Sequence, residues 1–222
     1  MDLLYSNILP LPTTEEQETI SDCFINQLKS SERIDICVGY VSDNSLKELE
    51  QLIDDNNISN VTLTIGMYFI EGMPEKAYHT AMRINEKWQS SGIGEIRIVK
   101  AFKYHGKLYC FSKNNTPVSA IIGSANLSFL KPDANNRRHY EIAELITDST
   151  ELIKIEKHIK EVNSQKCSDN IASVKDMKLI AEENTALENV ELVKKLPPSN
   201  VDYYILFLKN TKVIHSEQYS FV

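Results

Sequence analysis

The sequence lacks the features that would place it outside the cytoplasm or in a membrane. Its four cysteines form no Cys-x-x-Cys pair, which argues against structural zinc and against a disulfide framework. No segment approaches the ~20 consecutive apolar residues that span a bilayer. Residues 1–12 also lack the basic start and apolar core of a signal peptide. We therefore expect a cytoplasmic protein with reduced cysteines and no membrane partner.

Basic residues are also scarce. The chain has 24 Lys and Arg against 31 Asp and Glu, a formal net charge of -7. Nonspecific affinity for nucleic acid comes mainly from Lys and Arg, which release counterions from phosphates. The charge balance therefore excludes a basic coat over the whole molecule, and a polyanionic substrate must be held locally.

The first hundred residues alternate between helical and strand patterns, and no internal repeat is visible. Apolar spacing predicts helices at residues 15–28, 43–53 and 74–89, and strands at 34–41, 61–67 and 96–99. This alternation favours an α/β layer structure in which helices cover a largely parallel or mixed sheet.

The rest of the chain extends this pattern and then changes character. Further strands are predicted at 102–111, 118–122 and 140–146, followed by a helix at 150–162. We expect one main domain over residues 1–164, an acidic linker over 165–200 and a short β-hairpin over 201–222.

Two short motifs carry the candidate chemistry. A strand through His105-Gly106-Lys107 would place the imidazole and the ammonium side by side, because alternate strand residues share one face. Sixteen residues after Lys107 comes Gly123-Ser124-Ala125-Asn126. Small residues there let a phosphate approach the backbone, while Ser124 and Asn126 supply hydrogen-bond donors.

The pair of motifs, HxK followed by GSxN, resembles the signature of the phospholipase D superfamily. With Val38-Gly39-Tyr40-Val41-Ser42 and Ile65-Gly66-Met67, residues 30–150 resemble the catalytic domain of NgoFVII-type restriction endonucleases. The resemblance implies a phospholipase D-like mixed β-sheet, flanked by helices on both faces, with one HxK/GSxN half-site per chain.

The resemblance also departs from the superfamily pattern at one position. Ser112 stands where the superfamily usually has an aspartate, five residues after the lysine. That aspartate is often associated with lipid-processing members, so its loss weakens a phospholipase interpretation. The carboxylate that hydrogen-bonds the catalytic histidine in such nucleases best matches Glu141. Glu144 is the rival, although it would point to the opposite face of the strand.

The resemblance implies a mechanism without metal or cofactor. His105 would attack phosphorus to form a phosphohistidine, while His105 of a second chain protonates the leaving oxygen. Lys107, Ser124 and Asn126 would neutralise and orient the nonbridging oxygens, and Glu141 would orient the imidazole. Because superfamily enzymes use two such motifs per active centre, we expect a homodimer. His158-Ile159-Lys160 repeats the HxK spacing in a helical pattern without GSxN, so we interpret it as chance.

We therefore expect a type II-like restriction endonuclease, or its catalytic subunit, that hydrolyses DNA. Gly123, Arg137 and Arg138 are candidate substrate-binding residues. Candidate partners are DNA, a second copy of the chain and a separate DNA-recognition or ATPase subunit. The alternatives are a hydrolase of another phosphodiester and a catalytically silent interaction subunit of the same fold.

One regulatory hypothesis concerns the acidic residues 170–191. This segment either lies over the active-site groove as a phosphate mimic or forms a solvated helix, and the composition favours the solvated helix.

Overall fold

The computed structural model describes residues 2–130 and 139–181, and the strands Tyr204–Phe207 and Lys212–His215. The chain divides into two compact units, Met1–Ile180 and Ala181–Val222. Residues 165–180, which the sequence analysis assigns to the linker, therefore lie within the first unit. The hypothesis of an acidic cover depends largely on residues 182–191, which lie outside the described part of the chain.

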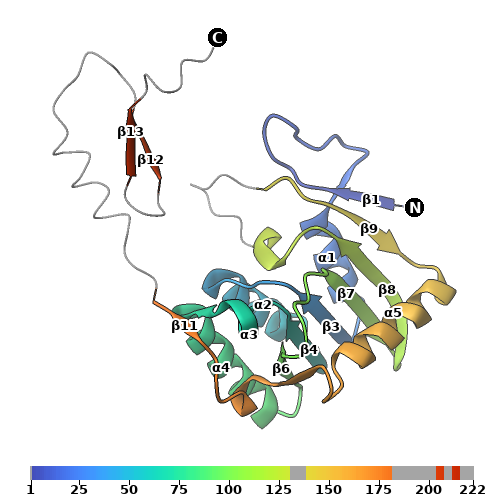
Figure 1. The fold of residues 1–222 in the computed structure, drawn as a ribbon. Coiled ribbons are helices and arrows are strands. Elements are labelled where there is room, and N and C mark those ends of the chain that lie inside the picture. The colour runs from blue at the N-terminus through green and yellow to red at the C-terminus, as the bar shows by residue number, and fades with distance from the viewer. Residues whose placement is uncertain (1, 131–138, 182–203, 208–211, 216–222) are drawn as a thin grey trace. The chain divides into compact units, whose positions relative to one another are not determined.

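A nine-stranded mixed sheet forms the centre of the first unit (Figure 1). Its strand order is β10-β6-β4-β3-β7-β8-β9-β1-β2. The three adjacent strands β6, β4 and β3 are parallel, and β7, β8, β9 and β1 then alternate in direction. The bounds are β1 Asp2–Tyr5, β2 Glu18–Thr19, β3 Arg33–Val38, β4 Asn60–Ile65, β6 Gly94–Val99, β7 Leu108–Lys113, β8 Thr116–Gly123, β9 Ile142–Ile146 and β10 Ser168–Asn170.

The remaining strands form two small sheets of two strands each. In the first unit, β5 (Met73–Pro74) pairs with β11 (Leu179–Ile180) in parallel. In the second unit, β12 (Tyr204–Phe207) and β13 (Lys212–His215) are antiparallel, as the hairpin pattern predicts.

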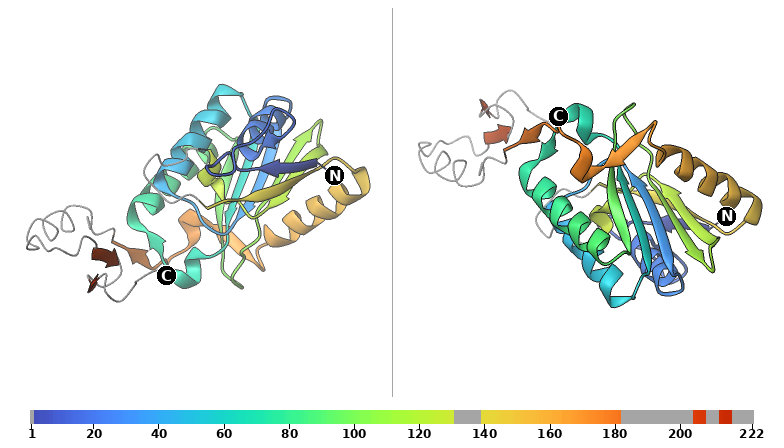
Figure 2. Two further views of the ribbon diagram at one scale, coloured as in Figure 1. Left: turned by 90° about the horizontal axis from the view of Figure 1, so that it is seen from above. Right: turned by 90° about the horizontal axis from the view of Figure 1, so that it is seen from below.

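Helices cover both faces of the central sheet (Figure 2). The apolar sides of α1, α2 and α4 pack with one face in the main core, whereas α5 packs on the other face. The bounds are α1 Ile20–Lys29, α2 Asp43–Asp55, α3 Tyr68–Glu71, α4 Glu75–Ser90 and α5 Ser149–Val162, with 3-10 turns η1 Leu127–Phe129 and η2 Ile171–Ser173. The expected α/β architecture, a large mixed sheet flanked by helices, is thereby confirmed.

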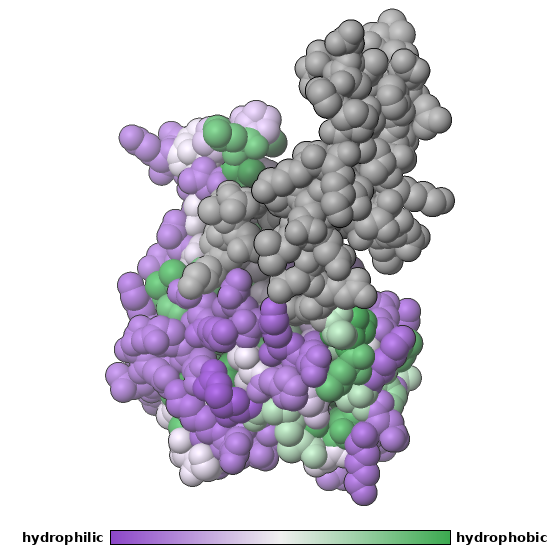
Figure 3. All heavy atoms as spheres, turned by 90° about the vertical axis from the view of Figure 1, so that its left-hand side faces the viewer, coloured by the Kyte–Doolittle hydropathy of each residue, from purple (hydrophilic) through white to green (hydrophobic). Residues whose placement is uncertain are grey.

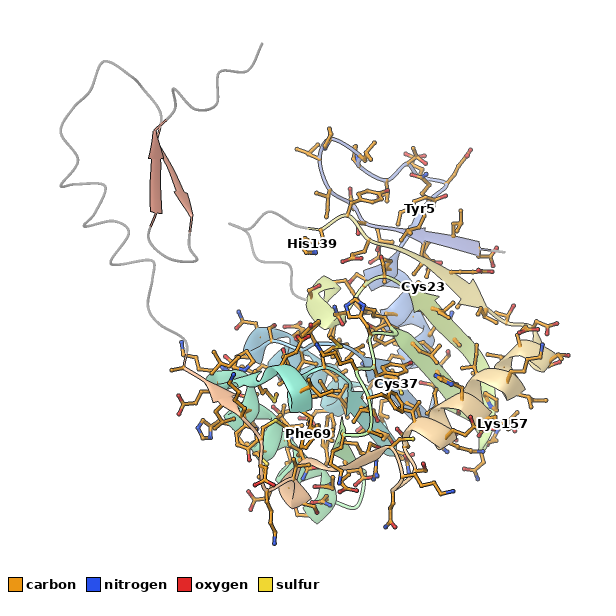
Figure 4. All side chains as sticks on the ribbon, viewed as in Figure 1. Tyr5, Cys23, Cys37, Phe69, His139 and Lys157 are labelled. Atoms are coloured by element: carbon orange, nitrogen blue, oxygen red, sulfur yellow. The ribbon has the colours of Figure 1, made fainter. Side chains whose placement is uncertain are left out.

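Strand β3 is covered on both faces of the sheet. Ile36 faces the core shared with α1 and α2, while its neighbour Cys37 packs with Val162 of α5 on the opposite face. Figure 4 labels Cys37 in this position. A strand covered on both faces needs apolar residues at consecutive positions instead of alternating ones.

The prediction of a strand over residues 102–111 is wrong at its beginning, because β7 starts only at Leu108. In the strand order β6-β4-β3-β7, the chain leaving β6 must pass two strands before it can enter the β7 position. Strands lie about 4.8 Å apart, so the segment 100–107 spans roughly 14 Å across their ends. His105 and Lys107 therefore belong to a crossover and not to a strand.

Two other boundaries differ for related reasons. Strand β9 begins at Ile142 and not at residue 140, so Glu141 lies just before the strand. Helix α1 begins at Ile20 and not at residue 15, because Glu18 and Thr19 pair with β1.

The described surface shown in Figure 3 is mostly hydrophilic, with hydrophobic residues in several separate groups. No helix within residues 2–130 and 139–181 is both long and apolar enough to cross a membrane.

Candidate active site

The strand directions bring the candidate residues to one edge of the sheet. Strands β3, β4 and β8 end at this edge, and the antiparallel strands β7 and β9 begin there. His105 and Lys107 precede β7, Gly123 ends β8, and Glu141 precedes β9. Residues separated by up to 36 positions are therefore neighbours, at the kind of strand terminus where α/β sheets bind ligands.

The crossover segment runs directly over the ends of β4 and β3. The backbone N–H of Tyr104 donates a hydrogen bond of 3.1 Å to the carbonyl oxygen of Gly66, just after β4. A Cβ atom at Gly66 would lie 2.0 Å from the Tyr104 carbonyl oxygen. Only glycine permits this close crossing, which carries the chain to His105.

His105 lies above the end of β3 with its side chain exposed. A Cβ atom at Gly39 would lie 3.1 Å from Cδ2 of the His105 ring and 3.6 Å from Oδ1 of Asn126. One glycine therefore adjoins both residues, so the imidazole and the Asn126 amide lie close together. The exposed ring is accessible to a substrate from solvent.

The orientation of Asn126 is determined by its backbone partners. Its Oδ1 accepts hydrogen bonds from the N–H groups of Gly39 and Tyr40, at 3.2 and 3.1 Å. Only the amide oxygen can accept from N–H donors, so the NH₂ group must point the other way. A primary amide group of this kind can donate hydrogen bonds to an anion.

Lys107 is a buried cation, with the residue only 6% exposed. Its Nζ donates a 2.6 Å hydrogen bond to the carbonyl oxygen of His105. Desolvation lowers the pKa of Lys107, and the negative charge of Glu141 partly opposes this change. Burial disfavours an uncompensated charge, so a bound anion would stabilise the protonated form of Lys107.

Ser124 and Glu141 form a pair that the sequence analysis did not predict. The Ser124 hydroxyl donates to Oε2 of Glu141 and accepts a 3.1 Å bond from the N–H of Ile142. The N–H of Glu141 donates to Oγ of Ser6 at 3.0 Å. Within the described residues no hydrogen bond joins Glu141 to His105, so the expected contact with the imidazole is replaced by one with Ser124.

The glycine of the GSxN motif has a packing role. A Cβ atom at Gly123 would lie 2.5 Å from both Cβ of Ala143 and the carbonyl oxygen of Ile142, so β9 leaves no room for a side chain. Its N–H also donates to the carbonyl oxygen of Lys107 at 3.2 Å, which ties the two motifs together. The candidate DNA-binding residues Arg137 and Arg138 lie outside the described residues. His139 follows them as an exposed residue (Figure 4).

Tyr109 forms a hydrogen bond with the segment that carries the GSxN motif. Its ring is buried, and its hydroxyl donates a 2.7 Å hydrogen bond to the carbonyl oxygen of Ala125. The sequence offered a signal for this role, since Tyr109 is a polar-tipped aromatic two positions after Lys107.

Tyr40 and Glu71 are further neighbours of the site that sequence reasoning missed. The Tyr40 ring lies edge-on to the His105 ring, with centroids 5.9 Å apart, and its hydroxyl donates to Glu71 at 2.5 Å. This bond raises the pKa of Tyr40 and is the first cause of the lowered pKa of Glu71, followed by the bond from Lys103. Tyr40 lies inside a motif noted above, but no sequence pattern marks Glu71.

The described residues contain no group of three His, Cys, Asp or Glu side chains arranged to hold a metal ion. The local donors are instead an imidazole, an ammonium and an amide. Such a set can neutralise and orient the oxygens of a phosphate.

Two solved structures are similar to the chain, and the first of them supports the fold. Phosphatidylserine synthase from Haemophilus influenzae Rd KW20 is similar with a TM-score of 0.50 and 15% identity, over 87% of this chain and 44% of that chain. The archaeal chromatin protein TrmBL2 gives a TM-score of 0.35 and 11% identity, over 63% of this chain and 45% of that chain. The chain thus spans less than half the length of either protein.

No curated protein sequence matches the chain. A family model does match, described as the NgoFVII restriction endonuclease N-terminal PLD domain, where PLD denotes phospholipase D. The match extends over residues 18–176, which is more than half of the chain and includes every described residue of the site except Ser6. The chain therefore belongs to the family of NgoFVII restriction endonuclease N-terminal phospholipase D domains.

Proposed function

We propose that this protein hydrolyses phosphodiester bonds of DNA without a metal ion, with His105 as the nucleophile. The observation that carries the proposal is the exposed His105 ring close to the amide of Asn126, whose oxygen is already engaged by two backbone N–H groups. Membership of a restriction endonuclease family supports DNA as the substrate. An acidic chain with local donors fits a substrate that is held at one site.

The proposed reaction has two steps. A ring nitrogen of His105 attacks phosphorus, so a P–N bond forms as the P–O bond to the leaving strand breaks. The leaving oxygen takes a proton from a second His105, contributed by another copy of the chain. Water then attacks phosphorus, breaks the P–N bond and returns a proton to the second histidine. The net change is the addition of one water molecule.

The neighbouring groups have distinct proposed roles. Lys107 and the NH₂ group of Asn126 hold the nonbridging oxygens as negative charge develops on them. Glu141 already accepts the hydroxyl proton of Ser124, so Ser124 is not a free donor in this arrangement. We assign to Ser124 the role of positioning Glu141, whose charge supports the protonated Lys107.

A homodimer completes the proposed site. The chain carries one HxK/GSxN set, whereas the reaction needs one neutral and one protonated imidazole. Ile122, two residues before Ser124, and Ile142, directly after Glu141, are 44% and 46% exposed. Exposed apolar side chains beside an incomplete site are suited to burial against a second copy. Recognition of a target sequence is proposed to depend on a further domain or subunit.

The test is plasmid cleavage by the purified protein in excess EDTA, compared with His105→Ala. We expect nicking or linearisation that persists in EDTA and is lost in the variant. Cleavage of a small-molecule phosphodiester but not of DNA would favour a different substrate. No turnover of either substrate would favour an interaction subunit.

A further inference from the structure

Glu71 joins three segments that surround His105. It lies at the end of α3, which follows β4, and one of its oxygens accepts the Tyr40 hydroxyl at 2.5 Å. The other oxygen accepts Nζ of Lys103 at 3.0 Å. Tyr40 follows β3, and Lys103 lies two residues before His105 in the crossover. A single carboxylate thus links the ends of two strands to the chain that carries the candidate nucleophile.

The Tyr40 ring packs against a second aromatic ring, in addition to the hydrogen bond from its hydroxyl to Glu71. It lies edge-on to the Tyr68 ring, with centroids 5.4 Å apart. The Tyr68 hydroxyl donates to the carbonyl oxygen of Val41 at 2.5 Å and accepts from the N–H of the same residue at 3.2 Å. Tyr40 and Tyr68 form an aromatic wall beside His105, and a hydrogen bond from each hydroxyl fixes it in place.

We propose that Glu71 is a positioning residue for His105, acting through Tyr40 on the imidazole ring and through Lys103 on the backbone that carries it. This inference deepens the proposed function and rests on it. Glu71 forms no described hydrogen bond with His105, although the two side chains lie close enough to interact electrostatically. The proposed effect is on the orientation of the ring. Attack on phosphorus requires a ring nitrogen to be aligned with the leaving oxygen, and small errors in position slow such steps strongly.

The two donors explain why a carboxylate is needed. Tyr40 and Lys103 donate to different oxygens of Glu71. Glutamine has the same shape but only one oxygen and no negative charge, so it cannot accept both bonds in this arrangement or pair with the Lys103 charge. Glu71→Gln therefore loosens the link while changing little volume.

The experiment compares Glu71→Gln with Glu50→Gln. Glu50 is a matched control because its two oxygens accept from Arg83 and Lys87, in a bridge between α2 and α4. For Glu71→Gln we expect kcat for DNA cleavage in EDTA to fall roughly tenfold. KM should stay within about twofold, since ground-state binding is retained. Glu50→Gln should leave both constants unchanged.

The tyrosine provides an independent check. Tyr40→Phe keeps the aromatic wall and removes the bond to Glu71, so it should lower kcat as well. If the two residues act as one unit, the double variant should be about as slow as the slower single variant. Multiplication of the two effects would contradict a shared link.

A second measurement does not depend on activity. The ring-proton NMR signals of His105, identified by their absence in His105→Ala, should shift in Glu71→Gln and also in Tyr40→Phe, which keeps the Glu71 charge, and should remain in place in Glu50→Gln. If wild-type protein does not cleave DNA but the signals shift, the proposed function fails and the positioning survives. If wild-type protein cleaves and Glu71→Gln retains its kcat and its His105 signals, the positioning role is overturned.

Discussion

At the scale of single residues, the two ends of the Asn126 amide differ in their partners. Its oxygen accepts two backbone N–H groups at the end of β3, and we propose that its NH₂ group faces the substrate. The structural and the chemical contributions of this residue therefore come from different atoms, and substitutions can separate them.

We predict that Asn126→Asp folds normally and does not cleave DNA. The carboxylate can still accept from Gly39 and Tyr40, but it has no donor and it repels phosphate. Asn126→Ala leaves the two N–H groups without this acceptor and should lower the free energy of unfolding by about 1–3 kcal/mol. Urea denaturation and plasmid cleavage measure the two effects. An active Asp variant would remove the amide from the proposed chemistry.

Lys107 illustrates a conflict between stability and function. Because burial lowers its pKa, the folded protein releases the proton more readily than the unfolded chain does. The unfolded state therefore binds more protons between the two pKa values, and stability rises with pH through that window. The cost of the buried charge is present in full below the pKa of the folded state.

We predict that Lys107→Met is more stable than the wild type at pH 7, by about 1 kcal/mol, because the buried charge is removed. This difference should shrink as the pH rises from the pKa of the folded lysine to that of the unfolded lysine. Cleavage should fall at least about 100-fold. Denaturation at pH 7 and at pH 10.5, together with the cleavage assay, tests both statements. Loss of stability in the variant would contradict the first.

At the scale of elements, the sequence predicted the longer helices and the central strands, but not the short strands β1, β2, β5, β10 and β11. Helices α2, α4 and α5 begin within one residue of their expected positions, because apolar spacing and N-caps such as Ser42 are local signals. The crossover at 100–107 was misread as a strand. Its alternating residues fit a strand, and only the order of β6, β4, β3 and β7 shows that the chain must cross there.

The same distinction applies to the candidate site. HxK and GSxN could be found from spacing, since each motif is contiguous in the sequence. The pairing of Ser124 with Glu141 and the link from Tyr40 through Glu71 to Lys103 could not be found in this way. These contacts join separate strand ends, so they depend on the tertiary structure and leave no periodic pattern.

Helix α5 allows a prediction at this scale. It covers the sheet face opposite α1 and α2, and Asp148 caps it by accepting from the N–H groups of Thr150 and Glu151, at 2.9 and 3.0 Å. Asp148→Ala should lower the free energy of unfolding by about 1 kcal/mol. Asp148→Asn retains a capping oxygen and serves as the control in thermal denaturation. Equal melting temperatures for the wild type and the alanine variant would exclude the capping contribution.

At the scale of the whole molecule, the proposed active site is assembled from two copies of the chain. A dimer of one wild-type and one His105→Ala chain, isolated through two different affinity tags, would contain a single His105 imidazole. If one histidine attacks while the other donates a proton, this dimer should show below about 1% of wild-type activity. A doubly tagged wild-type dimer is the control.

Half of the wild-type activity in the mixed dimer would show that each chain acts alone. A monomer in solution that cleaves DNA at full rate would lead to the same conclusion. Either result would remove the homodimer from the mechanism while leaving His105 as the nucleophile.

The most direct test of the central claim is to trap the covalent intermediate. Protein is mixed with DNA that carries ³²P at internal phosphates, in EDTA, and the reaction is stopped with alkali, in which phosphohistidine is stable. We predict acid-labile label on a single proteolytic peptide that contains His105, and no label in His105→Ala. DNA cleavage that proceeds without labelled protein, or label on another residue, would contradict the assignment of His105 as the nucleophile.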